Sequence, residues 1–461
     1  MRSPAAWSLP LMAACTVSPV SFAETGATAR PSLEVLPGQS QERVAVDQTP
    51  LRGVTEQAPW GARTTGRQLV SWQGTADELQ WRRKHPAVRI LGTVTLRRTW
   101  ALVEGLTLGG PDTMEERRRE RPRSVRGVAA LSPLDRLQWS WGPRFMDVTG
   151  AHNIWQTLPG RLGRPPVVAI IDTGTETSHP DLDVLRNLDA VHSLLDEGDI
   201  RDTVADPNED HGTACAGLAG ARDDGLGMSG MSPGAKILGL RVTDEEGTIT
   251  DFSILQALRL AADFGQPEAT HPLLRDEGHG PVRVVSMSLG GYDARILPAY
   301  EEAFSLLRER GIPAFVAAGN EAWTDRIAAP ANQRGALAVG CTMRYLDTEW
   351  LAPYSNAGPG LHVTAGGNMV YAPVSRSLRG VDWALFNGTS AATPLVAGLA
   401  ALVTWANDDL SSTMSPESWC DLLAAHLART AEDLGTPGWD PGYGHGRIHT
   451  RRALETPLDP R

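Results

Sequence analysis

The chain has 461 residues, of which 41% are hydrophobic and 21% are charged. This is the composition of a globular protein, and the length suffices for one large core with a smaller module beside it. The formal net charge of -11 argues against a nucleic-acid-binding role and leaves protein substrates open.

The first 23 residues have the features of an export signal. Arg2 supplies a positive start, a mostly small or apolar stretch runs over 5–20, and 21–23 resemble a cleavage site. A second interpretation stays open, in which Cys15 ends a lipoprotein signal and becomes the lipid-modified N-terminus. No later stretch reaches about 18 uninterrupted apolar residues. We therefore expect an exported protein, periplasmic or extracellular, without a transmembrane segment.

Three segments precede the large core. Residues 24–66 are rich in Pro, Gly, Ser, Thr and Gln and have no apolar period, which predicts a flexible lead-in. The segment 67–110 predicts a small α+β module, with strands at 68–72, 88–96 and 100–106 and a helix at 76–84. The segment 111–136 contains seven consecutive charged residues that cannot be buried together. We interpret it as an arginine-rich linker that can be cut.

The segment 137–461 repeatedly places an apolar, β-rich run before a helical run. The predicted strands are 167–171, 235–241, 282–287, 314–318 and 336–340, and the predicted helices are 212–221, 250–264, 297–310 and 391–407. Near-continuous apolar strands indicate burial on both faces. The prediction is an α/β fold with an open, mostly parallel sheet that helices flank on both faces.

Four polar residues stand where such a sheet gathers its functional groups, at the carboxyl ends of strands or the starts of helices. Asp172 follows the first strand and Asn320 follows the fourth, whereas His211 and Ser390 each open a helix. Each of these residues alone would be typical of a turn or a cap. Their joint placement indicates an active site.

These four residue types can together hydrolyse an amide. A serine hydroxyl at a helix N-terminus faces free backbone N–H groups that stabilise negative charge, so Ser390 is the expected nucleophile. Histidine titrates near neutral pH, so His211 is the expected base and Asp172 would fix its tautomer. The amide of Asn320 and the backbone N–H of Ser390 would stabilise the oxyanion.

The order Asp, His, Ser and the neighbouring residues resemble the subtilisin family of serine proteases. The resemblance covers about 137–454. It rests on Asp172-Thr173-Gly174, His179-Pro180-Asp181-Leu182, His211-Gly212-Thr213, Ser286-Met287-Ser288-Leu289-Gly290, Ala317-Ala318-Gly319-Asn320, Gly388-Thr389-Ser390-Ala391-Ala392-Thr393-Pro394 and Tyr443-Gly444-His445-Gly446. A departure is Ala365-Gly366-Gly367, where many relatives have Ala-Pro-Gly, followed by several inserted residues.

The resemblance implies a cleft for an extended peptide. Ser288, Leu289 and Gly290 would line the primary specificity pocket and pair with the substrate backbone, and Gly225 and Gly227 would lie in the opposite wall. The module at 67–110 would be the propeptide, which assists folding, inhibits the enzyme and is later removed. The expected partners are a protein or peptide substrate and this propeptide, with no nucleic acid, and we expect a monomer.

The cysteines allow more than one interpretation. Cys215 stands four residues after His211, so both lie on one helical face. It is either a small buried hydrophobe or, as in the thiol-bearing subtilases that it resembles, a thiol whose reaction with mercurials blocks His211. Cys341 and Cys420 are expected in separate core positions, with a disulfide between them as the alternative.

An acidic loop at 196–210 precedes His211. Subtilases frequently bind calcium, so this loop is either a structural calcium site or merely solvated, and no ligand can be assigned. The chemistry itself requires no metal. Two other functions share the predicted fold: an inactive binding protein, and an esterase or transpeptidase with the same acyl-enzyme step.

Overall fold

The computed structural model describes residues 55–57, 67–72, 78–79, 82, 89–104, 134–142, 144–148, 151 and 164–459, with gaps at 226, 276–277 and 292–293. The predicted export signal, with Cys15, and most of the predicted lead-in and linker lie outside the described residues.

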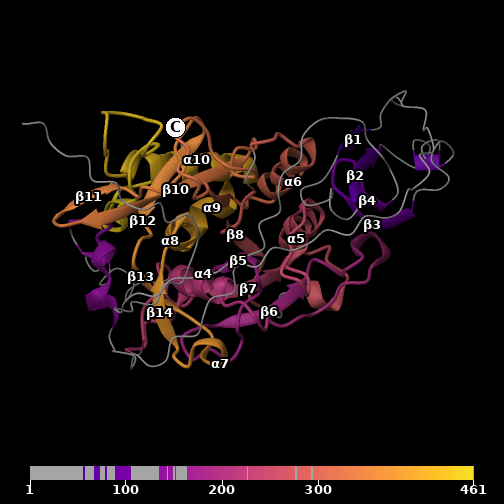
Figure 1. The fold of residues 1–461 in the computed structure, drawn as a ribbon, viewed down its shortest axis with the longest axis horizontal. Coiled ribbons are helices and arrows are strands. Elements are labelled where there is room, and N and C mark those ends of the chain that lie inside the picture. Colours follow the sequence, from indigo (N-terminus) through magenta and orange to yellow (C-terminus); the bar gives the residue numbers. More distant parts are fainter. Residues whose placement is uncertain are drawn as a thin grey trace, which may run out of the picture.

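Among the described residues, an eight-stranded sheet forms the centre of the molecule (Figure 1). Its order is β11-β10-β9-β8-β5-β7-β6, and β12 pairs with β10. The neighbours run parallel except in the β10–β11 hairpin. The strands are β5 Val167–Asp172, β6 Val184–Asp189, β7 Lys236–Arg241, β8 Val282–Met287, β9 Ala314–Ala317, β10 Ala336–Tyr345, β11 Thr348–Leu351 and β12 Leu361–Gly366. The predicted open, mostly parallel sheet is confirmed.

Three of these strands were not predicted. β6 carries polar residues among its apolar ones, and the short β11 and β12 lack a clear alternation. β10 also extends beyond 340, because its last residues pair antiparallel with β11. These elements are specified by their neighbours in the sheet more than by their own apolar pattern.

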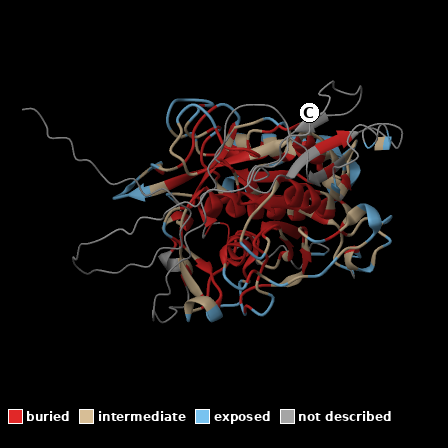
Figure 2. Cartoon of the chain, turned by 45° about the vertical axis from the view of Figure 1, so that its right-hand side comes forward, coloured by how far each residue is buried: buried red, intermediate tan, exposed pale blue. Residues whose placement is uncertain are grey.

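Helices cover both faces of the sheet. In β5, Val168 and Ile170 pack in one cluster with α4 and α8, whereas Val167, Ala169 and Ile171 pack in the other with α5 and α6. This is the two-residue period of a strand buried on both sides, and Figure 2 shows the resulting continuous buried interior. The helices are α4 His211–Gly220, α5 Asp251–Asp263, α6 Pro298–Glu309, α7 Arg376–Arg379, α8 Thr389–Ala406, α9 Asp408–Thr413, α10 Pro416–Thr430 and α11 Thr450–Glu455.

The helix α8 runs through the interior. It is the one helix among the described residues that is long and apolar enough to cross a membrane, and 94% of its apolar window is buried inside the protein. Pro394 lies near its start, where the missing N–H matters least. The helix therefore serves as a core element that carries Ser390 at its N-terminal end.

The N-terminal strands form a separate antiparallel sheet, which in the described residues has the order β1-β2-β4-β3. Its strands are β1 Thr55–Gln57, β2 Arg67–Trp72, β3 Arg89–Thr95 and β4 Thr99–Glu104. Residues 55–57, expected in the lead-in, form β1, which pairs with β2 although its three residues are polar. In the predicted helix, the described residues 78–79 and 82 are helical.

The boundary of the large domain also differs from the prediction. Leu134, expected in the linker, is 2% exposed and packs in the main core, and its backbone N–H donates to the carbonyl of Gly227. The large domain therefore begins by residue 134 rather than at 137.

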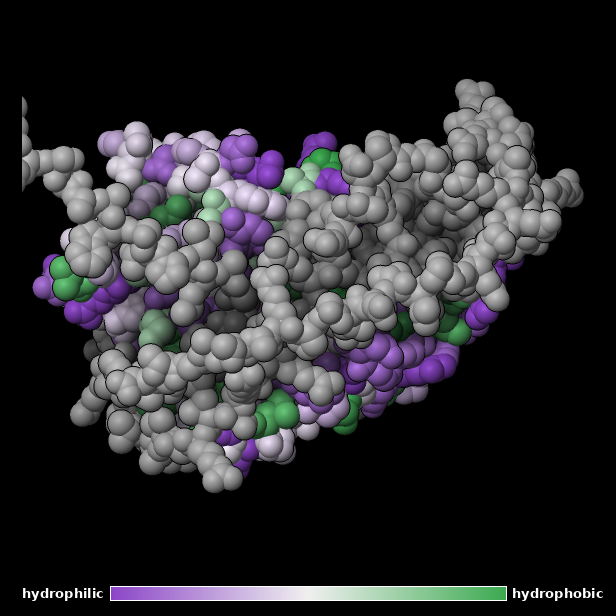
Figure 3. All heavy atoms as spheres, in the orientation of Figure 1, coloured by the Kyte–Doolittle hydropathy of each residue, from purple (hydrophilic) through white to green (hydrophobic). Residues whose placement is uncertain are grey.

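The described surface on the side seen in Figure 3 is mainly hydrophilic, with small separate hydrophobic areas. One such area lies at the left, at the end of the β10–β11 hairpin. There Tyr345, Leu346 and Trp350 are 63%, 77% and 56% exposed. Single exposed apolar residues of this kind are normal on a folded protein.

Candidate active site

Asp172 and His211 are hydrogen-bonded to each other in the interior. Asp172 ends β5 and His211 begins α4, and they are 2% and 5% exposed. Nδ1 of His211 lies 2.7 Å from Oδ1 and 2.9 Å from Oδ2 of Asp172. A carboxylate at Nδ1 keeps the proton on that nitrogen, so Nε2 is the acceptor of the neutral ring.

Contacts of the neighbouring residues explain the two short motifs Asp172-Thr173-Gly174 and His211-Gly212-Thr213. The backbone N–H of Gly212 donates to Oγ1 of Thr173 at 3.0 Å, which ties the start of α4 to the end of β5. A side chain at 212 would meet the carbonyl oxygen of Gly174 at 2.2 Å, so only glycine fits there. Oδ1 of Asp172 also accepts from the backbone N–H of Thr173 at 2.8 Å. Both motifs therefore fix the relative position of Asp172 and His211.

Ser390 is the second residue of α8 and is 3% exposed. Its hydroxyl donates to the carbonyl of Ser288 at 3.2 Å, and the hydroxyl of Ser288 donates to the carbonyl of Ser390 at 2.9 Å. Sγ of Cys215 lies 3.5 Å from the same Ser390 carbonyl and 3.8 Å from Nδ1 of His211. Cys215 thus contacts both His211 and Ser390, and Ser390 lies beside the segment that follows β8.

Asn320 lies close to the N-terminus of α8. Its Oδ1 accepts from the backbone N–H of Thr389 at 2.9 Å and from Oγ1 of Thr389 at 3.0 Å. These bonds assign the side-chain oxygen and turn the amide NH₂ away from Thr389. The preceding Gly319 has a φ of 102°, and a side chain there would meet Nδ2 of Asn356 at 2.3 Å. Glycine is therefore needed to place Asn320 after β9.

The predicted substrate-binding residues separate into two groups. Ser288, Leu289 and Gly290 follow β8 directly and lie beside Ser390 through the Ser288 contacts. Gly225 and Gly227 follow the C-terminal end of α4, about 15 Å along the helix axis from His211. A side chain at 227 would meet Trp383 and Asp181. Their place in the opposite wall of the cleft stays a prediction.

The three cysteines that the structure describes are free and buried. Cys341 and Cys420 therefore occupy separate positions without a disulfide. Burial raises the pKa of the Cys215 thiol, although the neighbouring His211 acts in the opposite direction. The thiol is thus protonated at neutral pH. Among the described residues, one group of side chains has potential metal-ligand atoms within 4.8 Å of one another. It consists of Asp172, His211 and Cys215.

Several carboxylates of the acidic loop are already bound within the chain. Asp196 accepts from the hydroxyl of Thr95, and Asp199 pairs with Arg201. Asp210 pairs with Arg379. These three carboxylates are therefore engaged within the chain.

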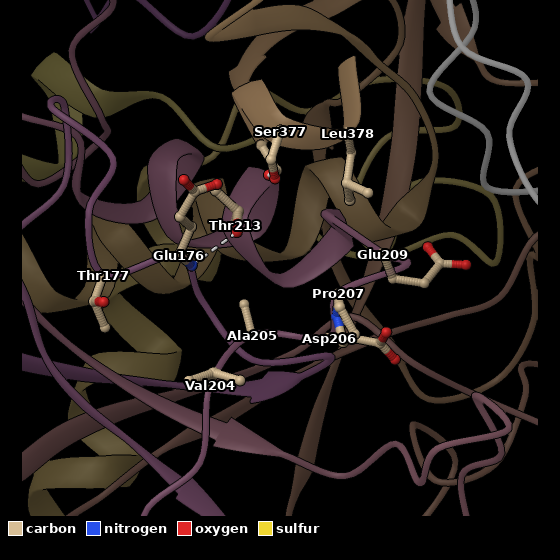
Figure 4. A pocket seen from close by; sticks show the side chains of 11 residues that line it. Glu176, Thr177, Val204, Ala205, Asp206, Pro207, Glu209, Thr213, Ser377 and Leu378 are labelled. Carbon is tan, nitrogen blue, oxygen red and sulfur yellow. Dashed lines mark hydrogen bonds between the residues drawn. The ribbon is translucent and has the colours of Figure 1, made fainter. Parts of the chain in front are cut away.

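A cavity of about 230 Å³ lies beside the start of α4. Figure 4 shows Ser377 and Leu378 of α7 on one side of it and Val204 and Ala205 on the opposite side. The carboxylates of Glu176, Asp206 and Glu209 also line it. The triad residues do not line this cavity, so it is separate from the place where the nucleophile lies.

A hairpin that the sequence did not predict packs on the imidazole. It consists of β13 Val370–Pro373 and β14 Trp383–Phe386, with α7 between them. The Phe386 ring lies edge-to-face on the His211 ring, with centroids 5.2 Å apart and an interplanar angle of 77°. The inserted residues after 367 were the only sign of this hairpin in the sequence.

Comparisons with known proteins agree with this geometry. The family model described as "Subtilase family" matches residues 163–446. "Thermophilic serine proteinase" of Bacillus sp. (strain AK1) is 32% identical over 280 residues, which are 60% of this chain and 60% of that protein. "Subtilisin Savinase" of Lederbergia lenta is 30% identical over 313 residues, which are 68% of this chain and 97% of that protein.

A solved structure supports the fold. The crystal structure of fervidolysin from Fervidobacterium pennivorans matches with a TM-score of 0.63 and 22% identity, over 88% of this chain and 62% of that one. By sequence the chain matches only 44% of fervidolysin. It therefore spans less than two thirds of the length of some of its relatives.

Proposed function

This chain belongs to the subtilase family of serine proteases, and we propose that it is a secreted serine endopeptidase that uses Asp172, His211, Ser390 and Asn320. The observation that carries the proposal is the Asp172–His211 pair, which leaves Nε2 as the acceptor of the neutral ring, while Cys215 contacts both His211 and the Ser390 carbonyl. This is the arrangement that activates a serine hydroxyl.

The reaction proceeds through an acyl-enzyme. Rotation of the Ser390 side chain moves its hydroxyl from the Ser288 carbonyl to Nε2 of His211, which takes the proton as the oxygen attacks the peptide carbonyl. The amide NH₂ of Asn320 and the backbone N–H of Ser390 stabilise the oxyanion. The imidazolium then protonates the leaving amine, and a water activated by His211 releases the acid product. Asp172 stabilises the imidazolium throughout.

The substrate binds as an extended strand along Ser288, Leu289 and Gly290. Gly290 packs closely on the neighbouring chain, because a side chain there would stand 3.3 Å from the Ala329 carbonyl. Gly225 and Gly227 follow the C-terminal end of α4, and we propose that they lie in the opposite wall of the cleft.

The test compares Ser390→Ala with wild type and with Ser412→Ala, a change of an exposed serine in α9. Wild type and the control should digest casein and react with a fluorophosphonate, and Ser390→Ala should do neither. In a subtilisin, removing this serine lowers turnover by about 10⁶. Labelling without casein digestion would favour the esterase or transpeptidase. Absence of both from the wild type would favour an inactive binding protein.

We also propose that the β1–β4 module is an inhibitory propeptide. Its β3–β4 turn contacts α6, with Arg97 Nη2 2.6 Å from Glu309 Oε1 and Arg98 Nε 3.1 Å from Glu302 Oε1. Val94 of the module is fully buried in the cluster with α5 and α6. A module held by a small apolar contact and exposed ion pairs can be released after cleavage, as an inhibitor that is later removed must be.

A structural calcium ion in the acidic loop at 196–210 is part of the proposal, without an assigned ligand. Asp206 and Glu209 of this loop line the cavity beside α4, and carboxylate oxygens are the ligands that calcium prefers. Such an ion would serve stability and no catalytic step.

A further inference from the structure

The inserted hairpin is bonded to the residue that precedes His211. Arg379 of α7 donates from Nε to Oδ2 of Asp210 at 2.7 Å and from Nη2 to Oδ1 at 3.0 Å. The Arg379 side chain is 10% exposed and that of Asp210 is 2% exposed. Two parallel bonds between a guanidinium and a carboxylate fix both distance and orientation.

Asp210 in turn determines where α4 begins. It is the N-cap residue of α4, and its backbone carbonyl accepts from the N–H of Ala214 at 3.0 Å. The same hairpin touches the imidazole directly through Phe386, and β14 is followed after two residues by α8, which carries Ser390. Arg379 therefore links the backbone next to the base to the hairpin that precedes α8.

We infer that Arg379 is a positioning residue for His211, which fixes the first turn of α4 through Asp210 and neutralises a buried negative charge beside the base. The inference rests on the proposed function, since it concerns the base of that reaction.

The charges around His211 give Arg379 its electrostatic role. Burial alone would lower the pKa of Arg379, and the hydrogen bonds and charge of Asp210, with Glu209, raise it above its usual value. The guanidinium therefore stays charged. Asp172 on β5 and Cys215 in α4 face the imidazole. Asp210 and Glu209, just before α4, face Arg379 of α7. Glu176 and Asp206 line the adjacent cavity. Without Arg379, uncompensated carboxylate charge would favour the imidazolium, which cannot act as a base.

The experiment measures kcat/KM against pH on a chromogenic peptide for wild type, Arg379→Met, Asp210→Asn and the double variant. In Arg379→Met the acid limb, which is the pH range where kcat/KM falls as His211 is protonated, should move up by about one pH unit. The plateau of kcat/KM at high pH should stay within a few fold of wild type. The double variant has neither charge, so its limb should return towards wild type. Asp210→Asn, which leaves the cation alone, should move the limb down.

The matched control is Arg376→Met in the same short helix. Arg376 pairs with Asp382 and its side chain is 67% exposed, so its loss should leave the limb unchanged. An acid limb in Arg379→Met equal to that of wild type overturns the inference, as does a lower plateau with an unmoved limb. If Arg379→Met does not fold, an unmoved limb in Asp210→Asn overturns it. An inactive wild type would refute the proposed function instead.

Discussion

The proposed oxyanion hole makes the sharpest prediction, because the structure fixes the orientation of one of its donors. Oδ1 of Asn320 is held by two bonds from Thr389, at 2.9 and 3.0 Å, so the NH₂ group must face the other way. Replacing Asn320 by Ala removes this donor and leaves the backbone N–H of Ser390. In a subtilisin, the loss of the corresponding donor costs about 3 kcal/mol of transition-state stabilisation, or about 10²–10³ in kcat.

The assay is steady-state kinetics on a peptide substrate, with active sites counted by fluorophosphonate. Asn320→Ala should lower kcat by that factor with little change in KM, since the donor acts only on the transition state. Asn320→Asp keeps an oxygen for the Thr389 bonds but replaces the donor by a carboxylate, so it should lose at least as much. A kcat within threefold of wild type, or a loss confined to KM, would refute the assignment of the donor.

Three other outcomes are expected. Cys215→Ser should keep most of the activity and abolish inactivation by mercurials, because the Cys215 sulfur lies 3.8 Å from Nδ1 of His211. Mercurial inactivation of the variant would exclude this thiol as the target. Removal of calcium by a chelator should lower the melting temperature by about 5 °C if a structural site had been about 100-fold saturated, and an unchanged melting temperature would exclude a structural calcium ion. Purified residues 24–110 should inhibit the mature enzyme in trans. A double change of Arg97 and Arg98 to Glu should weaken that inhibition about 10-fold at low salt, and the difference should shrink at high salt. Equal inhibition by the wild-type and the doubly changed module would contradict the docking contacts.

The sequence predicted the parts of the site that depend on local signals. Asp172 and Asn320 stand at the ends of apolar strands, and Ser390 opens a long apolar helix, so strand and helix periodicity sufficed to place them near one edge of a sheet. The role of Gly225 and Gly227 stays a prediction, because a glycine-rich loop has no pattern that says which surface it covers. No sequence pattern indicated the strand at 55–57, whose polar residues pair with a neighbouring strand.

The sequence by itself determined the α/β architecture and the order of the chemical groups, because both are written in local periodicity and in short motifs. The tertiary structure alone decided what surrounds them. The bond between Arg379 and Asp210 joins residues 169 positions apart, and Phe386 reaches His211 from a hairpin inserted late in the chain. Such contacts arise only when the core packs and brings distant segments together, so no local pattern could have revealed them.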